Sequence, residues 1–91
     1  MTLLDDSPVT TYAYRTARRH EIVTTGGMDA VLRVGSALRA TGYAVRDFAV
    51  EVHDGVPYGS ITCTVSLTSA ECEVFSRRMA AHADVVAVEP R

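Results

Sequence analysis

The chain lacks four residue types altogether, and these absences narrow the chemistry that it can perform. It contains no lysine, asparagine, glutamine or tryptophan, and its nine basic residues are all arginine. Without lysine it cannot form a Schiff base with a carbonyl substrate, and it cannot carry a Walker-type phosphate loop. It has only two cysteines, Cys63 and Cys72, which are too few for a disulfide framework in 91 residues.

Long hydrophobic runs are also missing. No stretch approaches the roughly eighteen apolar residues that a membrane-spanning helix needs. The chain begins Met-Thr-Leu-Leu-Asp-Asp, which places acids where a secretory signal carries bases. The net charge of −2 disfavours a nucleic-acid binder, because affinity for phosphates needs a positive field. We therefore expect a cytoplasmic protein that binds neither membranes nor nucleic acid.

The composition is that of one small globular domain. Apolar residues make up 47% of the chain and charged residues 22%, and both values are ordinary for folded proteins. Residues 1–11 are polar and contain Pro8, so we expect a flexible N-terminal arm there. The domain itself should occupy residues 12–91, with one modest core.

The first half of this domain predicts a strand, a helix and a second strand. Strand-forming residues between 12 and 24 end at a Gly26-Gly27 break. Apolar residues then recur at helical spacing and predict a helix over 28–41, followed by Gly42 as its C-terminal cap. The next apolar residues alternate over 43–52 with a slip between Val45 and Phe48, which predicts a β-bulge.

The second half predicts a strand, a helix and a final strand. Asp54-Gly55 is a hairpin signal, and after it apolar and hydroxyl residues alternate strictly over 60–67. Thr68 and Glu71 have the spacing of a capping box that opens a helix. The chain finishes with an apolar strand over 85–88.

This order predicts an α+β fold of the ferredoxin-like βαββαβ type, in which a four-stranded antiparallel sheet carries two helices on one face. The other face of the third strand would show only small hydroxyl side chains, which are Ser60, Thr62, Thr64 and Ser66. That face is either exposed to solvent or covered by another molecule. A sheet with helices on one face only commonly dimerises through its uncovered side.

Three stretches resemble ACT domains. Residues 28–45 resemble the first helix and second strand of that family, with Arg39-Ala-Thr-Gly42-Tyr43 at the helix end. The strand over 61–69 and the ending 82–88 also fit. The likeness covers about residues 16–89 and is closest to the short single-domain regulatory subunits of acetolactate synthase.

The resemblance implies a regulatory homodimer without a cofactor, which binds a small amino-acid effector, a larger catalytic subunit of acetolactate-synthase type, or both. In ACT domains the amino acid lies between subunits, at the loop from the first strand to the first helix and at the start of the facing strand. These positions map onto Thr25, Gly26, Gly27, Met28 and Asp29 in the loop, and onto Ala44 and Val45 in the strand. Backbone amides at a helix N-terminus would hold the carboxylate of the effector.

The mapped site departs from the valine-sensing subunits at three positions. Gly26 and Ala44 stand where those subunits carry asparagine, and Asp29 stands where they carry glycine. A carboxylate at Asp29 would repel the carboxylate of the ligand, although it could meet an ammonium group. The resemblance therefore leaves open a different effector or none.

Several residues have a structural interpretation beside the functional one. The two glycines can serve a tight turn, and Asp29 can serve the helix dipole. Both cysteines fall on core-facing stripes. The three histidines are scattered along the chain, so we expect no metal site, and His82 is expected to cap the second helix. The basic run Arg15, Arg18, Arg19 and His20 predicts a solvated strand face or an interface rim, with a phosphate or nucleic-acid site as the alternative.

Two alternative functions remain open. Ferredoxin-like dimers also include small monooxygenases and cyclases, which need a closed pocket between sheet and helices with a convergent acid or base. The candidate polar groups for such an enzyme are Tyr12, Tyr14, His20 and Tyr58. The third interpretation is a purely structural dimer.

Overall fold

The structure is a computed structural model that describes residues 14–91. Its elements follow the predicted order: β2 (Thr16–Thr25), α2 (Gly27–Ala40), β3 (Val45–Val52), β4 (Tyr58–Leu67), α3 (Ser69–Ala80) and β5 (Val85–Pro90). The expected arm over residues 1–11 lies outside the described residues, and so does Tyr12.

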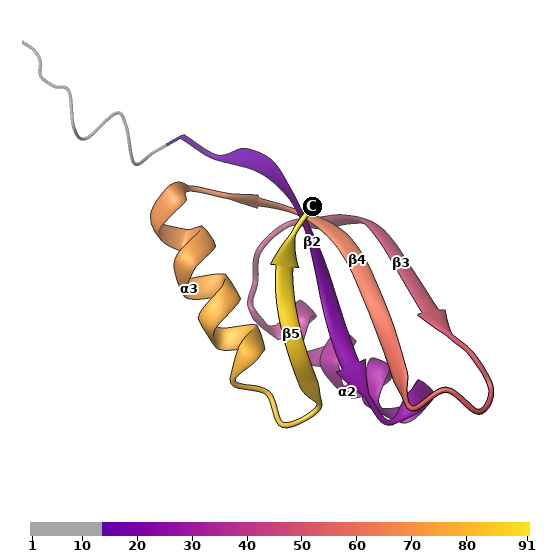
Figure 1. The fold of residues 1–91 in the computed structure, drawn as a ribbon. Coiled ribbons are helices and arrows are strands. Elements are labelled where there is room, and N and C mark those ends of the chain that lie inside the picture. Colours follow the sequence, from indigo (N-terminus) through magenta and orange to yellow (C-terminus); the bar gives the residue numbers. More distant parts are fainter. Residues whose placement is uncertain (1–13) are drawn as a thin grey trace, which may run out of the picture.

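The four strands form one antiparallel sheet in the order β3-β4-β2-β5. Helix α2 packs on β2 and β4, and helix α3 packs on β5 and β4 (Figure 1). This is the predicted ferredoxin-like βαββαβ arrangement. It leaves β3 and β5 as the two edges of the sheet.

The core lies between the sheet and the helices because alternate strand residues point towards them. Ile22 of β2 pairs with Ile61 of β4, and neither side chain is exposed. The buried apolar residues that surround this pair are Val31, Val34, Leu38, Cys63, Val65, Leu67, Phe75 and Met79. These side chains fill the space between the central strands β2 and β4 and the two helices.

The two helices begin differently. Thr68 and Glu71 form the predicted capping box, in which each side chain accepts a hydrogen bond from the other residue's backbone amide, at 3.1 Å and 3.0 Å. Helix α2 instead follows Gly26, whose φ of 100° lies in the left-handed region and which provides no side-chain cap. The first turn of α2 thus begins with no side chain bonded to its amides.

Strand β3 contains the predicted bulge. Its register with β4 shifts between Arg46 and Ala49, and Asp47 has a φ of 52°. A bulge bends a strand and increases its twist. Here it lies next to Phe48, whose ring reaches the glycine in the middle of α2, Gly35.

Two predictions about histidines were wrong. His20 was expected on a solvated basic strand face, but its side chain is only 1% exposed because it points from β2 towards the helices. His82 was expected to cap α3. That helix ends at Ala80, and the Nδ1 atom of His82 accepts a hydrogen bond from the backbone amide of Asp84 at 3.1 Å, so its ring closes the turn into β5 instead.

Candidate functional site

The loop between β2 and α2 is held at one end of the sheet by two backbone hydrogen bonds. The amide of Thr25 donates to the carbonyl of Asp84, and the amide of Gly26 donates to the carbonyl of Pro57, both at 2.9 Å. Gly26 and Gly27 both have positive φ, at 100° and 77°. The sharp reversal of the chain therefore depends on glycine, as the structural interpretation of this pair supposed.

The N-terminus of α2 has the character of an anion-binding position. The first amides of a helix have no intrahelical acceptor and carry its positive dipole end. No side chain of residues 14–91 caps α2, and Met28 and Asp29 in its first turn are exposed. A carboxylate can approach these amides, while the carboxylate of Asp29 is free to meet an ammonium group.

The other half of the mapped site lies far from this loop within one chain. Val45 is aligned with Val65 of β4, whereas Thr24, next to the loop, is aligned with Gly59. Six residues of strand separate these positions, which corresponds to about 20 Å. The structure therefore keeps Thr25, Gly26, Gly27, Met28 and Asp29 together and places Ala44 and Val45 at the opposite end of the sheet.

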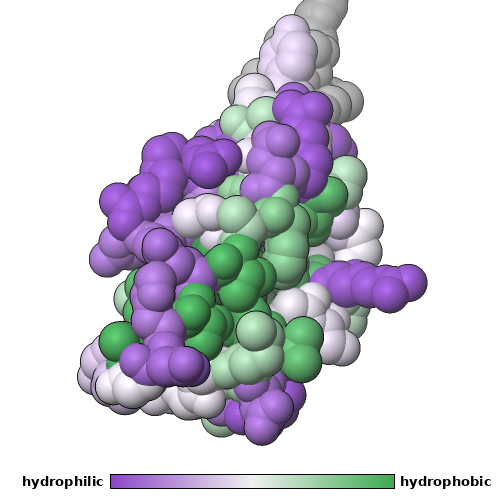
Figure 2. All heavy atoms as spheres, turned by 90° about the vertical axis from the view of Figure 1, so that its right-hand side faces the viewer, coloured by the Kyte–Doolittle hydropathy of each residue, from purple (hydrophilic) through white to green (hydrophobic). Residues whose placement is uncertain are grey.

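An apolar face lies beside the loop, over α2 and the outer edge of β3. Met28 and Leu32 of α2 are 55% and 63% exposed, and Phe48 and Val50 of β3 are 51% and 40% exposed. These four side chains line one shallow groove, and Figure 2 shows hydrophobic side chains gathered on this side of the molecule within a hydrophilic border. We call these four residues the edge face.

The edge face was not identified from the sequence. Leu32 belongs to the apolar pattern that predicts this helix, and that pattern does not distinguish a buried leucine from an exposed one. Phe48 was counted as an alternating strand residue, but it lies in the bulge, where the alternation of sides is interrupted. The signal that could have found the face is the width of the apolar stripe on α2, which includes Met28 and Leu32 as well as the buried Val31 and Leu38.

The polar groups considered for an enzyme lie apart. Tyr58 is opposite Thr25 at the loop end of the sheet, whereas Tyr14 precedes β2 at the other end. Both rings are exposed, and His20 is buried in the core between them. The described residues of this group do not converge on one cleft.

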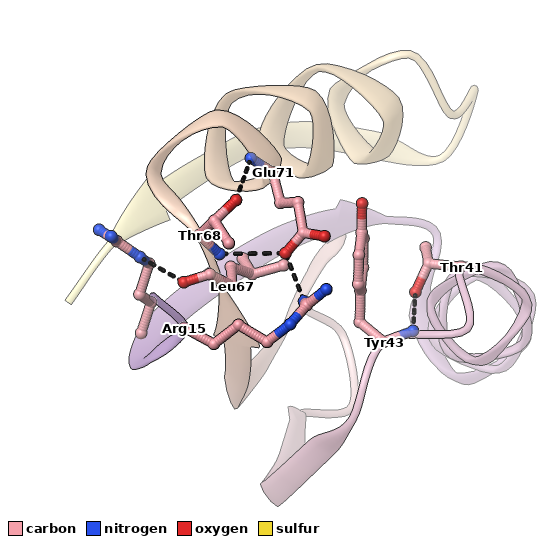
Figure 3. Close-up of polar contacts among 7 residues, drawn as sticks. Arg15, Thr41, Tyr43, Leu67, Thr68 and Glu71 are labelled. Atoms are coloured by element: carbon pink, nitrogen blue, oxygen red, sulfur yellow. Dashed lines mark hydrogen bonds and ion pairs between the residues drawn. The ribbon is translucent and has the colours of Figure 1, made fainter. Parts of the chain in front are cut away.

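The basic residues of this run do not form one surface. Arg15 extends to Glu71 at the start of α3, where the two side chains form an ion pair (Figure 3). Arg18 points to the same helix and donates from Nε to the carbonyl of Leu67 at 3.2 Å. Arg19 lies on the other face of the sheet, where it is the cross-strand neighbour of Thr64 in β4.

His20 lies in an apolar environment beside a thiol. Its ring packs edge-on against Phe75, and its Nε2 atom lies 3.8 Å from the sulfur of Cys72. Its Nδ1 atom lies 3.3 Å from the carbonyl of Arg18. Burial lowers the pKa of His20 below its ordinary value, so the neutral ring is favoured, with Nδ1–H as donor and Nε2 as acceptor.

The two cysteines are free, as expected for core thiols. Cys63 is buried and its burial raises the pKa of the thiol, whereas Cys72 is half-buried at the rim of the core. Residues 14–91 contain no group of three or more histidine, cysteine, aspartate or glutamate side chains that could hold a metal ion.

No protein-family model matches this sequence, and no curated protein matches it. Among the helices that the structure describes, none is both long and apolar enough to span a bilayer.

Proposed function

We propose that this protein is a stand-alone ACT-like regulatory domain, which dimerises side by side and binds a small amino-acid effector, a catalytic subunit of acetolactate-synthase type, or both. The observation that carries this proposal is the edge face on α2 and β3. An exposed group of large apolar side chains on a small monomer marks an interaction surface.

Strand β3 supplies the backbone part of the interface. Among the strands that the structure describes it pairs only with β4, so its outer edge presents unpaired amides and carbonyls along the edge face. A second copy can join this edge in the antiparallel direction and extend the sheet across the dimer. Its α2 then lies against the α2 of the first copy, and the apolar side chains of both are covered.

A dimer of this kind also completes the effector site. Val52, at the end of β3, is aligned with Gly59 and Thr24 and so lies at the loop end of the sheet. Antiparallel pairing reverses the strand direction, so the start of the second copy's β3 approaches this loop. The two halves of the mapped site, separated within one chain, meet across the seam.

The chemistry of this seam suits a zwitterion with an apolar side chain. The uncapped amides of α2 attract the carboxylate, and Asp29 attracts the ammonium group. The neighbouring Met28 offers an apolar surface to the side chain of the effector. Effector binding would favour one arrangement of the two subunits by its difference in affinity, and the catalytic partner would sense that arrangement.

The dimer is tested by the mass of the protein in solution. We expect light scattering after size exclusion to give twice the chain mass for the parent protein and a single chain mass for Leu32→Glu. The matched control is Val74→Glu, because Val74 is also an exposed apolar residue on a helix but lies on α3. A monomeric parent protein, or equal dissociation by the control, would contradict the proposed interface.

The effector is tested by thermal unfolding with each of the twenty amino acids. A ligand at a hundred times its Kd stabilises by about 2.7 kcal/mol, and each kcal/mol moves the midpoint by roughly 4–8 °C in a small domain. We expect one amino acid to raise the midpoint and Asp29→Ala to abolish the rise, whereas Asp54→Ala in the β3–β4 turn keeps it. A flat response, together with no copurifying partner, would refute a regulatory function.

A further inference from the structure

A second cleft lies on the helix-free face of the sheet, at the end away from the β2–α2 loop. Its floor is formed by Thr64 and Ser66 of β4. Small side chains make the hollow, because Ser66 is paired with Ala17 and Ala44 also lines the cleft. The volume is about 300 Å³, enough for a small polar ligand.

Arginines surround this floor. Arg46 of β3 and Arg19 of β2 are the two cross-strand neighbours of Thr64, one on each side. Arg15 lines the cleft from the start of β2. Arginine and hydroxyl groups together are suited to the oxygens of an oxyanion, since a guanidinium can donate two parallel hydrogen bonds.

The charges around the cleft do not balance within the described part of the chain. Glu71 pairs with Arg15, and its pKa is lowered by its hydrogen bond from the Thr68 amide and by Arg15. Arg19 and Arg46 form no ion pair with any carboxylate of residues 14–91, although Asp47 follows Arg46 in the bulge.

The acids on this face lie further along the sheet. Glu21 is opposite Thr62 and pairs with Arg91, and Glu51 is opposite Ser60. The cleft therefore retains about two uncompensated positive charges in a protein whose net charge is −2. A phosphate group carries about −1.5 to −2 charges near pH 7 and would balance them.

We propose that this cleft binds a phosphate dianion, either free or as part of a small phosphomonoester. Arg46 supplies the charged donors, the hydroxyls of Thr64 and Ser66 supply neutral donors, and Arg19 adds positive potential. Thr64 is only 8% exposed, so neighbouring residues cover most of its side chain. All of these residues belong to one chain, so the site does not depend on the proposed dimer.

The experiment is a titration of the full chain with inorganic phosphate, followed by amide chemical shifts in two-dimensional NMR at constant ionic strength. We expect saturable shifts at residues 44–46 and 64–66. Arg46→Ala and Thr64→Val should each weaken binding by about tenfold, since each removes one strong donor. The matched control is Arg78→Ala, because Arg78 is an exposed arginine on α3 that lies outside the cleft.

A second arm uses glycerol 3-phosphate to separate the two sources of the group. Tighter binding than inorganic phosphate indicates a phosphomonoester, and equal binding indicates free phosphate. The proposal is overturned if chloride at the same ionic strength gives the same shifts, or if Arg78→Ala weakens binding as much as Arg46→Ala. Chemical-shift changes centred on residues 27–29 would also overturn the proposal, because phosphate would then bind at the N-terminus of α2. That outcome would leave the thermal-unfolding test of the amino-acid effector undecided.

Discussion

His20 lies on the helix-facing side of β2, between Phe75 and Cys72 of α3. A histidine in such a position is favoured in its neutral form, because a charge would lose its water without gaining a counter-ion. The Nδ1–H group keeps a backbone acceptor in the carbonyl of Arg18. The residue therefore behaves as a satisfied core side chain rather than as part of a basic surface.

This environment predicts a pH-dependent stability. Burial lowers the folded-state pKa of His20 below its ordinary value of 6.5. Below that pH the unfolded chain takes up a proton that the folded chain does not, so the free energy of unfolding falls as the pH drops through 6.5. It stops falling once the folded histidine also protonates. Urea unfolding between about pH 7.5 and 5.5 measures this change, above the range where carboxylates titrate.

The control for this prediction is a second histidine. His20→Phe should remove most of the pH dependence in this range, because phenylalanine fills a similar space without a titrating group. His53→Phe should retain it, since His53 is exposed in the turn between β3 and β4. An unchanged pH profile in His20→Phe would show that another group is responsible.

Substituting alanine for Gly26 and for Gly35 should change the free energy of unfolding in opposite directions. Gly26 has a φ of 100°, so alanine there is strained and should cost about 1–2 kcal/mol of unfolding free energy. Gly35 lies within α2, and an added Cβ would meet only the ring of Phe48 at an ordinary 3.7 Å. Gly35→Ala should therefore stabilise by about 0.5–1 kcal/mol. Denaturant unfolding of both variants gives the two signs, and a stabilising Gly26→Ala would contradict the backbone argument.

At the scale of the element, the two helices obtain their N-termini by different means. Helix α3 is closed by its own capping box, whereas α2 begins after a glycine turn whose backbone is bonded to Pro57 and Asp84. In a capped helix the first backbone amides already have acceptors, whereas in an uncapped helix they can donate hydrogen bonds to a ligand. This difference is the reason that the proposed effector site is placed at α2.

The capping box of α3 predicts a defined loss of stability. Thr68→Ala removes the hydroxyl that accepts from the Glu71 amide and should cost about 0.5–2 kcal/mol. Thr68→Ser loses the same methyl group but keeps the hydroxyl, so the difference between the two variants isolates the cap. Both are measured by urea unfolding. Equal stability of the two variants would show that the cap contributes nothing.

At the scale of the whole molecule, dimerisation and folding should be linked. If the folded chain associates through the edge face, its unfolding midpoint rises with protein concentration, because mass action favours the associated folded state. Leu32→Glu should abolish this dependence, whereas Val74→Glu should preserve it. Thermal unfolding over a hundredfold range of concentration measures the effect. A midpoint independent of concentration in the parent protein would mean that the chain folds without a partner.

The element order and the caps were predictable from local sequence. The glycine break, the Asp54-Gly55 turn, the Thr68 box and the slip that marks the bulge all act within a few residues, and all appear in the structure near their predicted places. The buried face of β4 follows from alternation in the same way. Local periodicity is enough here because each element buries one face.

What the sequence by itself determined is therefore the fold, along with the chemistry excluded by its missing residue types. The tertiary structure alone decided which side chains share a surface. It buried His20 and placed Arg19 and Arg46 around Thr64. It left Leu32 and Phe48 exposed on one edge, and it separated Ala44 from the loop that precedes α2. These outcomes depend on strand order and register, which join residues distant along the chain and leave no local pattern from which to predict them.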